Sequence, residues 1–367
     1  MKRRDFLKGS AFAGAGAVAA ASAFPAPAIA QGMRELKMVT TWPKNFPGLG
    51  TGAERVAKRI TDASGGKLTV KVFAAGELVP PFESFDAVSN GTADLYHGAE
   101  YYWQGKSKAF NFFAAVPFGL TATELNAWVY YGGGQELWDE LAADFKLKPF
   151  LSGNTGVQMG GWFNKEINSL EDYKGLKIRM PGLGGEVLRR IGAAAVSLPG
   201  GEIFPALQSG AIDATEWVGP WNDLAFGFYK VAKFYYYPGF HEPGTGLSCG
   251  INLDVWNSFS ADEKALVEDA MIAENNFTLA EFTARNGDAL NTLINQHGVE
   301  LRKFSDDVMK AIGQASGEVV AEAAAGDAMT GRVYDSFVKF RKMAISWSKL
   351  ADQAYWNARL LPFNYGG

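Results

Sequence analysis

Apolar residues recur with two different periods over the first part of the chain after position 30. Alternating or continuous apolar runs indicate strands, and apolar or small residues at helical spacing indicate helices. The expected elements are strands at 36–42, 67–73 and 93–97 and helices at 52–63 and 81–89. Strands that alternate with helices in this way predict a largely parallel sheet with covering helices. The stretch 120–145 is expected to be mostly helical, with an interruption at the glycines of 132–134.

A second set of such units begins near residue 157. It contains expected strands at 157–163, 177–180, 195–198 and 211–215 and helices at 184–191 and 203–210. A loop rich in Pro and Gly at 238–244 then precedes a strand at 247–253 that fits a return to the first set. From residue 261 onward the pattern is almost wholly helical, in the segments 261–294, 306–325 and 334–360.

This order of elements predicts an α/β fold, a two-lobed binding protein with a ligand cleft between the lobes. The expected lobes are residues 31–152 with about 245–280, and 153–244 with about 281–326, followed by a long C-terminal helix over 327–367. That helix carries an apolar stripe made of Phe337, Phe340, Ala344, Trp347 and Leu350. Such a stripe needs a partner surface, and both the chain's own lobes and a second subunit fit this requirement.

The first thirty residues have the three-part pattern of a secretory signal. Arg3 and Arg4 precede a weakly apolar stretch rich in Ala and Gly, and Ala28 and Ala30 frame a small-x-small cleavage site. The paired arginines indicate the twin-arginine type. An uncleaved membrane anchor fits less well, because the apolar stretch is short and poor in leucine. We therefore expect residues 1–30 to be a signal peptide and the protein to lie in the periplasm, without a membrane-spanning segment after residue 30.

Composition excludes several classes of partner, metal site and activity. A net charge of −4 without a basic run excludes a nucleic-acid partner. With three histidines and one cysteine in 367 residues, the common zinc, haem and iron–sulfur sites are nearly excluded. His97 has no nucleophile motif beside it, and the glycines at 182–185 lack the lysine of a phosphate-binding loop. The sequence therefore gives no indication of an enzyme.

Three polar segments fall where strands are expected to be interrupted or to end. Asn154 and Gln158 lie in a glycine-rich segment, for which a plain β-bulge is an alternative explanation. Arg179 lies near the end of a strand, the position at which open α/β sheets bind ligands, and a guanidinium binds a carboxylate in a bidentate manner. Glu216 and Trp217 follow the next strand. Considered alone, Arg179 also fits a surface ion pair, and Glu216 fits an ordinary structural or solvated acid.

Together these segments closely resemble the substrate-binding subunits of tripartite ATP-independent periplasmic (TRAP) transporters, specifically the branch that binds 2-oxo acids such as pyruvate. The resemblance covers essentially the whole chain after residue 30. It is most specific at 154–163, 175–179, 212–220 and 235–239, and extends to 77–80 and 97–103. It implies a receptor that works with TRAP membrane subunits and forms a homodimer by exchange of its C-terminal helix.

The resemblance also implies roles for individual residues. Arg179 would hold the ligand carboxylate, while Gln158, Glu216, the main-chain carbonyl of Trp217 and Glu242 would bind a cation. A 2-oxo acid offers a carboxylate oxygen and its keto oxygen to one ion, and oxygen ligands suit Na⁺ or Ca²⁺. The other expected contacts of the ligand are Asn154, Tyr101, Tyr102, Trp217 and Phe240.

His241 matches no fixed residue type of the family. Two alternatives remain open from the sequence. One is a receptor for lactate or another 2-hydroxy acid with Ca²⁺, and the other is an exported, metal-assisted enzyme.

Overall fold

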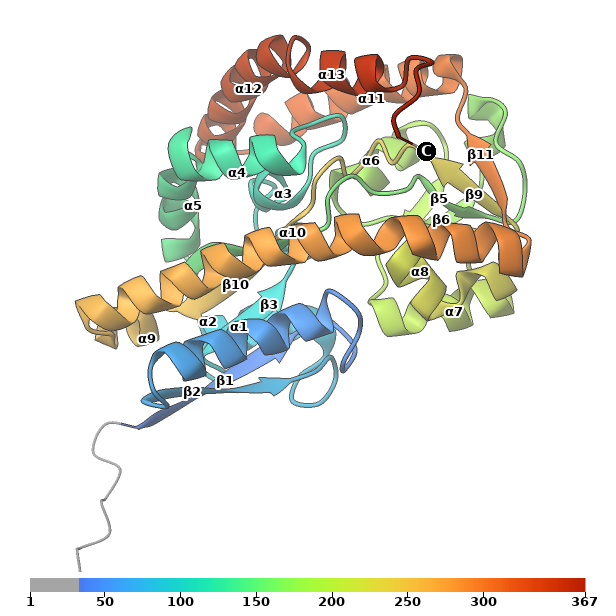
Figure 1. Ribbon diagram of the computed structural model, residues 1–367. Helices are drawn as coiled ribbons and strands as arrows, with labels where there is room; N and C mark the ends of the chain where they lie inside the picture. Colours follow the sequence, from blue (N-terminus) through green and yellow to red (C-terminus); the bar gives the residue numbers. More distant parts are fainter. Residues whose placement is uncertain (1–32, 367) are drawn as a thin grey trace, which may run out of the picture. The chain divides into compact units, whose positions relative to one another are not determined.

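The computed structural model describes residues 33–366, and from Glu35 onward the chain forms one compact unit that contains two β-sheets (Figure 1). The first sheet contains, in spatial order, β2 (Leu68–Phe73), β1 (Arg34–Thr40), β3 (Leu95–Gly98), β10 (Gly246–Asn252) and β4 (Leu147–Asn154). The second contains β11 (Glu300–Lys303), β9 (Phe234–Tyr237), β5 (Gly161–Phe163), β8 (Ala214–Thr215), β6 (Lys177–Arg179) and β7 (Ala194–Val196). The predicted signal peptide and its cleavage site lie outside the described residues.

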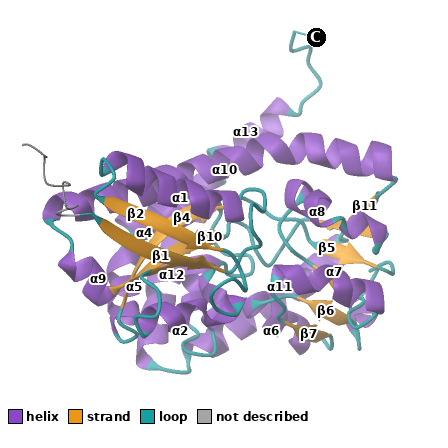
Figure 2. Ribbon diagram, turned by 90° about the horizontal axis from the view of Figure 1, so that it is seen from below, coloured by secondary structure: helices purple, strands orange, loops and turns teal. Residues whose placement is uncertain are grey.

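Helices pack around both sheets (Figure 2). They are α1 (Gly50–Ala63), α2 (Ser84–Ser89), α3 (Phe110–Ala114), α4 (Ala122–Tyr131), α5 (Gly134–Ala143), α6 (Gly182–Arg190), α7 (Gly200–Ser209), α8 (Pro220–Phe226), α9 (Leu253–Ser258), α10 (Ala261–His297), α11 (Asp306–Ala324), α12 (Ala328–Ser348) and α13 (Asp352–Arg359). Within residues 33–366, no helix has the length and apolar character needed to cross a membrane.

The longest helix, α10, packs on strand β4 of the first sheet and on helix α8, which follows strand β8 of the second sheet. Its 37 residues begin at a capping box formed by Ser260 and Glu263 and end at Gly298, whose φ of 66° closes the last turn. Along its length α10 packs on β4 and α1 and then on α8 (Figure 1). A single rigid helix thus connects the surroundings of the two sheets.

Both sheets are mostly parallel, as predicted, but each contains one reversed strand. β1 and β3 are parallel, whereas β10 runs antiparallel to β3 and β4. In the second sheet β5 runs antiparallel to β9 and β8, and the other pairs are parallel. The reversal follows from the connections, because β5 and β10 are each entered directly from the other sheet, through residues 155–160 and 238–245. The predicted return of the strand at 247–253 to the first sheet is confirmed.

Several predicted elements differ from those observed. The strand predicted at 157–163 begins only at Gly161, because the amides of Gln158 and Met159 bond to the carbonyls of Glu242 and Val218 instead of a neighbouring strand. Strands β4, β9 and β11 were not predicted. The predicted long C-terminal helix is present as α12, but its predicted continuation to residue 360 is wrong, since the chain leaves the helical region at Ala351, with ψ −93°, before α13.

The apolar stripe of the last helix has two different environments. Phe337 is buried and packs edge-to-face on Phe112 and Trp128, with ring centroids 5.3 Å apart in both pairs. Trp347 and Leu350, in contrast, are 69% and 74% exposed. The first half of the stripe therefore packs on its own chain, and its second half has no apolar cover among the described residues.

Asp223, at the start of α8, holds the turn that follows β8. Its buried carboxylate accepts hydrogen bonds from Trp162 Nε1 at 2.9 Å, from the Tyr235 hydroxyl at 2.7 Å and from the Val218 amide at 3.3 Å. Burial raises the pKa of Asp223 from 3.8 to about 7, although these three donors act in the opposite direction. The position of residues 216–219 thus depends on a carboxylate from which water is excluded.

We predict a pH effect from this group. Because its pKa is higher in the folded than in the unfolded chain, Asp223 binds more protons in the folded state between pH 3.8 and about 7. Its contribution to the free energy of unfolding therefore falls as pH rises through that interval. The stability of Asp223→Asn relative to wild type should rise over the same interval, as measured by urea unfolding. Asp335→Asn, at an exposed position, controls for loss of one charge. A relative stability that falls with pH would contradict this assignment.

Candidate ligand and cation site

Two crossing segments, residues 155–160 and 238–245, lie side by side where the chain passes between the sheets. The Thr155 amide donates to the Thr245 carbonyl and the Gln158 amide to the Glu242 carbonyl, each at 3.1 Å. The Gly239 amide returns a bond to the Gln158 carbonyl at 3.0 Å. This short ladder fixes the direction of the side chains that the two segments contribute.

Arg179, the last residue of β6, is buried to 1% exposure. Its Nε donates to the Leu198 carbonyl at 3.1 Å, and its Nη1 pairs with the carboxylate of Glu216. Its Nη2 lies 3.4 Å from the Tyr102 hydroxyl, and the guanidinium lies 5.1 Å from the ring centre of Trp217. Burial by itself would lower the pKa of Arg179, but the Glu216 carboxylate together with Tyr102, Tyr101 and Glu242 outweighs this effect, and the pKa is raised. The guanidinium is therefore a permanent, oriented positive charge.

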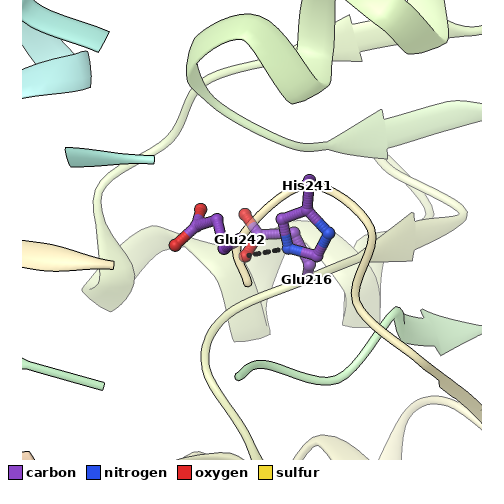
Figure 3. Close-up of side chains that lie close together, drawn as sticks. All are labelled: Glu216, His241 and Glu242. Atoms are coloured by element: carbon purple, nitrogen blue, oxygen red, sulfur yellow. Dashed lines mark ion pairs between the residues drawn. The ribbon is translucent and has the colours of Figure 1, made fainter. Parts of the chain in front are cut away.

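Glu216, His241 and Glu242 form a buried cluster (Figure 3). One possible ligand atom from each residue lies within 4.8 Å of the others. His241 Nε2 lies 3.3 Å from Glu216 Oε2, and Glu242 accepts a hydrogen bond from the Thr245 hydroxyl. Burial, together with the nearby Glu216, raises the pKa of Glu242 to about 7. Two carboxylates are thus held close together away from water.

Gln158 presents a free oxygen beside this cluster. Its Nε2 donates to the hydroxyls of Thr155 and Thr245, at 3.1 Å each, so the orientation of the amide is determined. Its Oε1 is buried and has no hydrogen-bond partner, as is also true of Glu216 Oε2. Buried acceptors rarely stay unsatisfied in native proteins. Carboxylate and amide oxygens left in this state fit a hard cation such as Na⁺ or Ca²⁺.

A small cavity adjoins these groups. The space inside it that a water-sized sphere can occupy is about 10 Å³, room for about one water molecule and far below the roughly 300 to 1,000 Å³ of typical small-molecule pockets. Its lining consists of Trp42, Leu49, Tyr101, Tyr102, Thr155, Gln158, Trp217, Val218, Thr245 and Leu247. Arg179 reaches the cavity wall through its contacts with Tyr102 and Trp217. The cavity wall combines the polar groups of Thr155, Gln158 and Thr245 with aromatic and apolar side chains.

Most of the residues predicted for the site are brought together. Arg179, Glu216, Glu242, Gln158, Trp217, Tyr101 and Tyr102 all lie in the cluster or the cavity wall. Asn154 instead accepts a hydrogen bond from the Gly156 amide at 2.9 Å, and Phe240 stacks on Phe118 with centroids 5.9 Å apart. Neither of these two residues lines the cavity, and their contact with a ligand stays a prediction.

Other residues of the wall were not predicted. Leu49, Val218 and Leu247 are apolar side chains without any chemical signature in the sequence, and Thr155 and Thr245 act by orienting Gln158. His97 is buried and its Nδ1 accepts a hydrogen bond from Trp42 Nε1 at 2.8 Å. Burial lowers the pKa of His97 to about 4, so the ring is neutral and fits a structural role.

Known proteins resemble this chain over most of its length. A monocarboxylate 2-oxoacid-binding periplasmic protein of Nostoc sp. is 42% identical over 360 residues, which are 97% of this chain and 98% of the relative. A TRAP periplasmic solute-binding protein of Pseudoalteromonas atlantica, solved with bound sodium and pyruvate, is 41% identical with a TM-score of 0.86, covering 89% of this chain and 99% of that one.

A third relative, a TRAP solute-binding protein of Bordetella bronchiseptica, is 36% identical with a TM-score of 0.87 over 89% of this chain and 97% of its own. It was solved as a mixed-occupancy dimer, with co-purified calcium and picolinate in one active site and the other site apo. The family model for bacterial extracellular solute-binding proteins, family 7 (DctP), matches residues 38–327. The two-sheet α/β fold, the buried charge cluster and these likenesses agree, and the chain belongs to the DctP family of solute-binding proteins.

Proposed function

We propose that this protein is the periplasmic receptor of a TRAP transporter and that it binds a short 2-oxo monocarboxylate, such as pyruvate, together with Na⁺ or Ca²⁺. The observation that carries the proposal is the convergence of Arg179, two buried carboxylates and the free oxygen of Gln158 on one small cavity. The names of the relatives support it, since these proteins bind a 2-oxo acid, or pyruvate or picolinate with a cation.

The charges of the site explain why a cation is needed. When Glu242 is ionised, Glu216 and Glu242 carry two negative charges, and Arg179 balances one of them. A carboxylate ligand adds a third negative charge to a region from which water is excluded, and this is costly unless a cation lies among the acids. Glu216, Glu242, Gln158 Oε1 and the Trp217 carbonyl would hold that ion. A bound ion supplies the opposite charge and coordinates the keto and carboxylate oxygens of the ligand.

Arg179 would bind the ligand carboxylate from the other side. Nε and Nη1 are occupied by Leu198 and Glu216, which leaves Nη2, beside the Tyr102 hydroxyl, as the donor directed to a ligand. Charge-assisted bonds of this kind are stronger than neutral ones. The apolar residues Leu49, Val218 and Leu247 would then surround the short carbon chain.

The two lobes predicted from the sequence would close over the ligand through the crossing segments. Residues 155–160 and 238–245 connect the sheets and also supply Gln158 and Glu242, so ligand contacts and the hinge belong to the same backbone. Closure around the ligand would give the membrane subunits a form to recognise. We therefore propose a transport receptor, and not an enzyme.

We predict that Arg179→Ala loses pyruvate binding. Removal of one partner from a buried charge contact costs about 2 to 5 kcal/mol, a loss of affinity of about 30-fold or more. Isothermal titration calorimetry with pyruvate and, in parallel, lactate measures the effect and ranks the two acid classes. Arg189→Ala, on the outer face of α6, is the control. Unchanged pyruvate affinity in folded Arg179→Ala would rule out this role.

We also propose that the chain forms a homodimer through its C-terminal helices. The surface from α12 onward exposes large apolar side chains, which are Met343, Ile345, Trp347, Leu350, Tyr355, Trp356, Leu360, Leu361, Phe363 and Tyr365. Figure 2 shows the residues after α13 extending away from the rest of the chain. Exposed apolar patches of this kind are typical of protein interfaces. The dimer of the Bordetella relative supports the proposal.

The double substitution Trp347→Glu with Leu350→Glu should therefore convert the dimer to a monomer. Placing charges in an apolar interface costs far more free energy than it does on an exposed surface. Light scattering coupled to gel filtration measures the mass. Tyr131→Glu, at a position that is 93% exposed and outside the patch, is the matched control. A dimer that survives the double substitution would contradict this interface.

A further inference from the structure

His241 is the one member of the buried cluster to which the proposed function gives no role. It lies in the crossing segment 238–245 and is 1% exposed, yet neither of its ring nitrogens has a hydrogen-bond partner among the described residues. An unbonded polar group in a protein interior costs free energy, and such groups are rare in native structures. An imidazole kept in this position therefore requires an explanation.

The ring is held against the carboxylate of Glu216. Nε2 lies 3.3 Å from Glu216 Oε2, slightly longer than a usual N–H···O bond and not aligned as one (Figure 3). On its other side, His241 packs on α6, where a Cβ added to Gly184 would lie 2.8 Å from the His241 Cβ. The imidazole thus lies between α6 and Glu216, with its Nε2 facing Glu216 Oε2.

The two oxygens of Glu216 then have different partners. Oε1 pairs with Arg179, and Oε2 faces His241. A carboxylate oxygen has two lone pairs, so Oε2 accepts a bond from His241 and still faces a cation. Na⁺ and Ca²⁺ take oxygen ligands in proteins, which argues against the imidazole nitrogen as a direct ligand for either ion. The remaining role for His241 is to orient Glu216.

We propose that His241 is a positioning residue that donates Nε2–H to Glu216 Oε2 and thereby holds this carboxylate in the geometry that binds the cation. The inference rests on the proposed function in one respect, namely that Glu216 binds a cation. Hydrogen bonds behind metal-ligating groups fix their orientation, and removing them typically weakens metal binding about 10- to 100-fold.

Calorimetric titration of Ca²⁺ into chelator-treated full-length protein, without any organic acid, tests the proposal. His241→Ala should bind Ca²⁺ about 10- to 100-fold more weakly than wild type. His241→Gln, whose amide Nε2–H reaches the same direction, should keep most of the wild-type affinity. His297→Ala, at the exposed end of α10, should behave as wild type. Thermal unfolding of each metal-free variant verifies that it is folded.

Three other outcomes overturn the inference, and a fourth separates it from the proposed function. If His241→Ala binds Ca²⁺ with wild-type affinity, Glu216 does not need His241 to orient it. If wild-type protein does not bind Ca²⁺, the premise that Glu216 binds a cation fails. If His241→Ala and His241→Gln lose Ca²⁺ affinity equally, and both lose more affinity for Zn²⁺ than for Ca²⁺, the imidazole is a direct metal ligand. A protein that binds Ca²⁺ in a His241-dependent manner but does not bind pyruvate would refute the proposed function and leave this inference standing.

Discussion

The buried ion pair between Arg179 and Glu216 is the interaction on which the rest of the site depends. Both side chains are at most 1% exposed, and bringing two charges out of water costs several kcal/mol per ion. Apolar residues of similar volume in these positions often give equal or greater stability. The pair is therefore poorly explained as a device for stability. It is well explained as a preformed arrangement of charge that a ligand and a cation complete.

The fold supports this pair from three directions. Parallel strands β6 and β8 end side by side, so Arg179 is paired with Thr215 in the sheet and Glu216 follows directly. The Glu216 amide also donates to the Arg179 carbonyl at 3.2 Å. Asp223 accepts a hydrogen bond from the Val218 amide and so fixes the turn after β8. The two crossing segments, which are hydrogen-bonded to each other, position Gln158 and Glu242. Each contributor belongs to a different part of the sequence, and the connections between the sheets bring them together.

The strongest sequence predictions concern residues whose chemistry is local. Arg179 and the Glu216–Trp217 pair were identified because they stand at strand ends, where open α/β sheets bind ligands. Gln158 was identified because polar residues and glycines interrupt an expected strand, and the family resemblance added Glu242. The return strand at 247–253 was also predicted correctly, because a loop rich in Pro and Gly precedes it. These signals are contained within a few residues.

What was missed depends on contacts between distant segments. Residues 157–160 have the composition of a strand, but their amides bond to Val218, Glu242 and Tyr236, which no local pattern indicates. Leu49 lines the cavity from the loop before α1 and has no feature that distinguishes it from a core leucine. The position of His241 between Gly184 and Glu216 likewise follows from packing alone.

The central claim is that one cation and one small carboxylate bind jointly between Arg179 and the paired acids. The most direct test is calorimetric titration of pyruvate into wild-type protein at a series of Ca²⁺ concentrations, in sodium-free buffer. Joint binding predicts that pyruvate affinity rises with Ca²⁺ concentration and, by linkage, that pyruvate raises the affinity for Ca²⁺ by the same factor. Equal pyruvate affinity with Ca²⁺ and with a chelator would contradict the account.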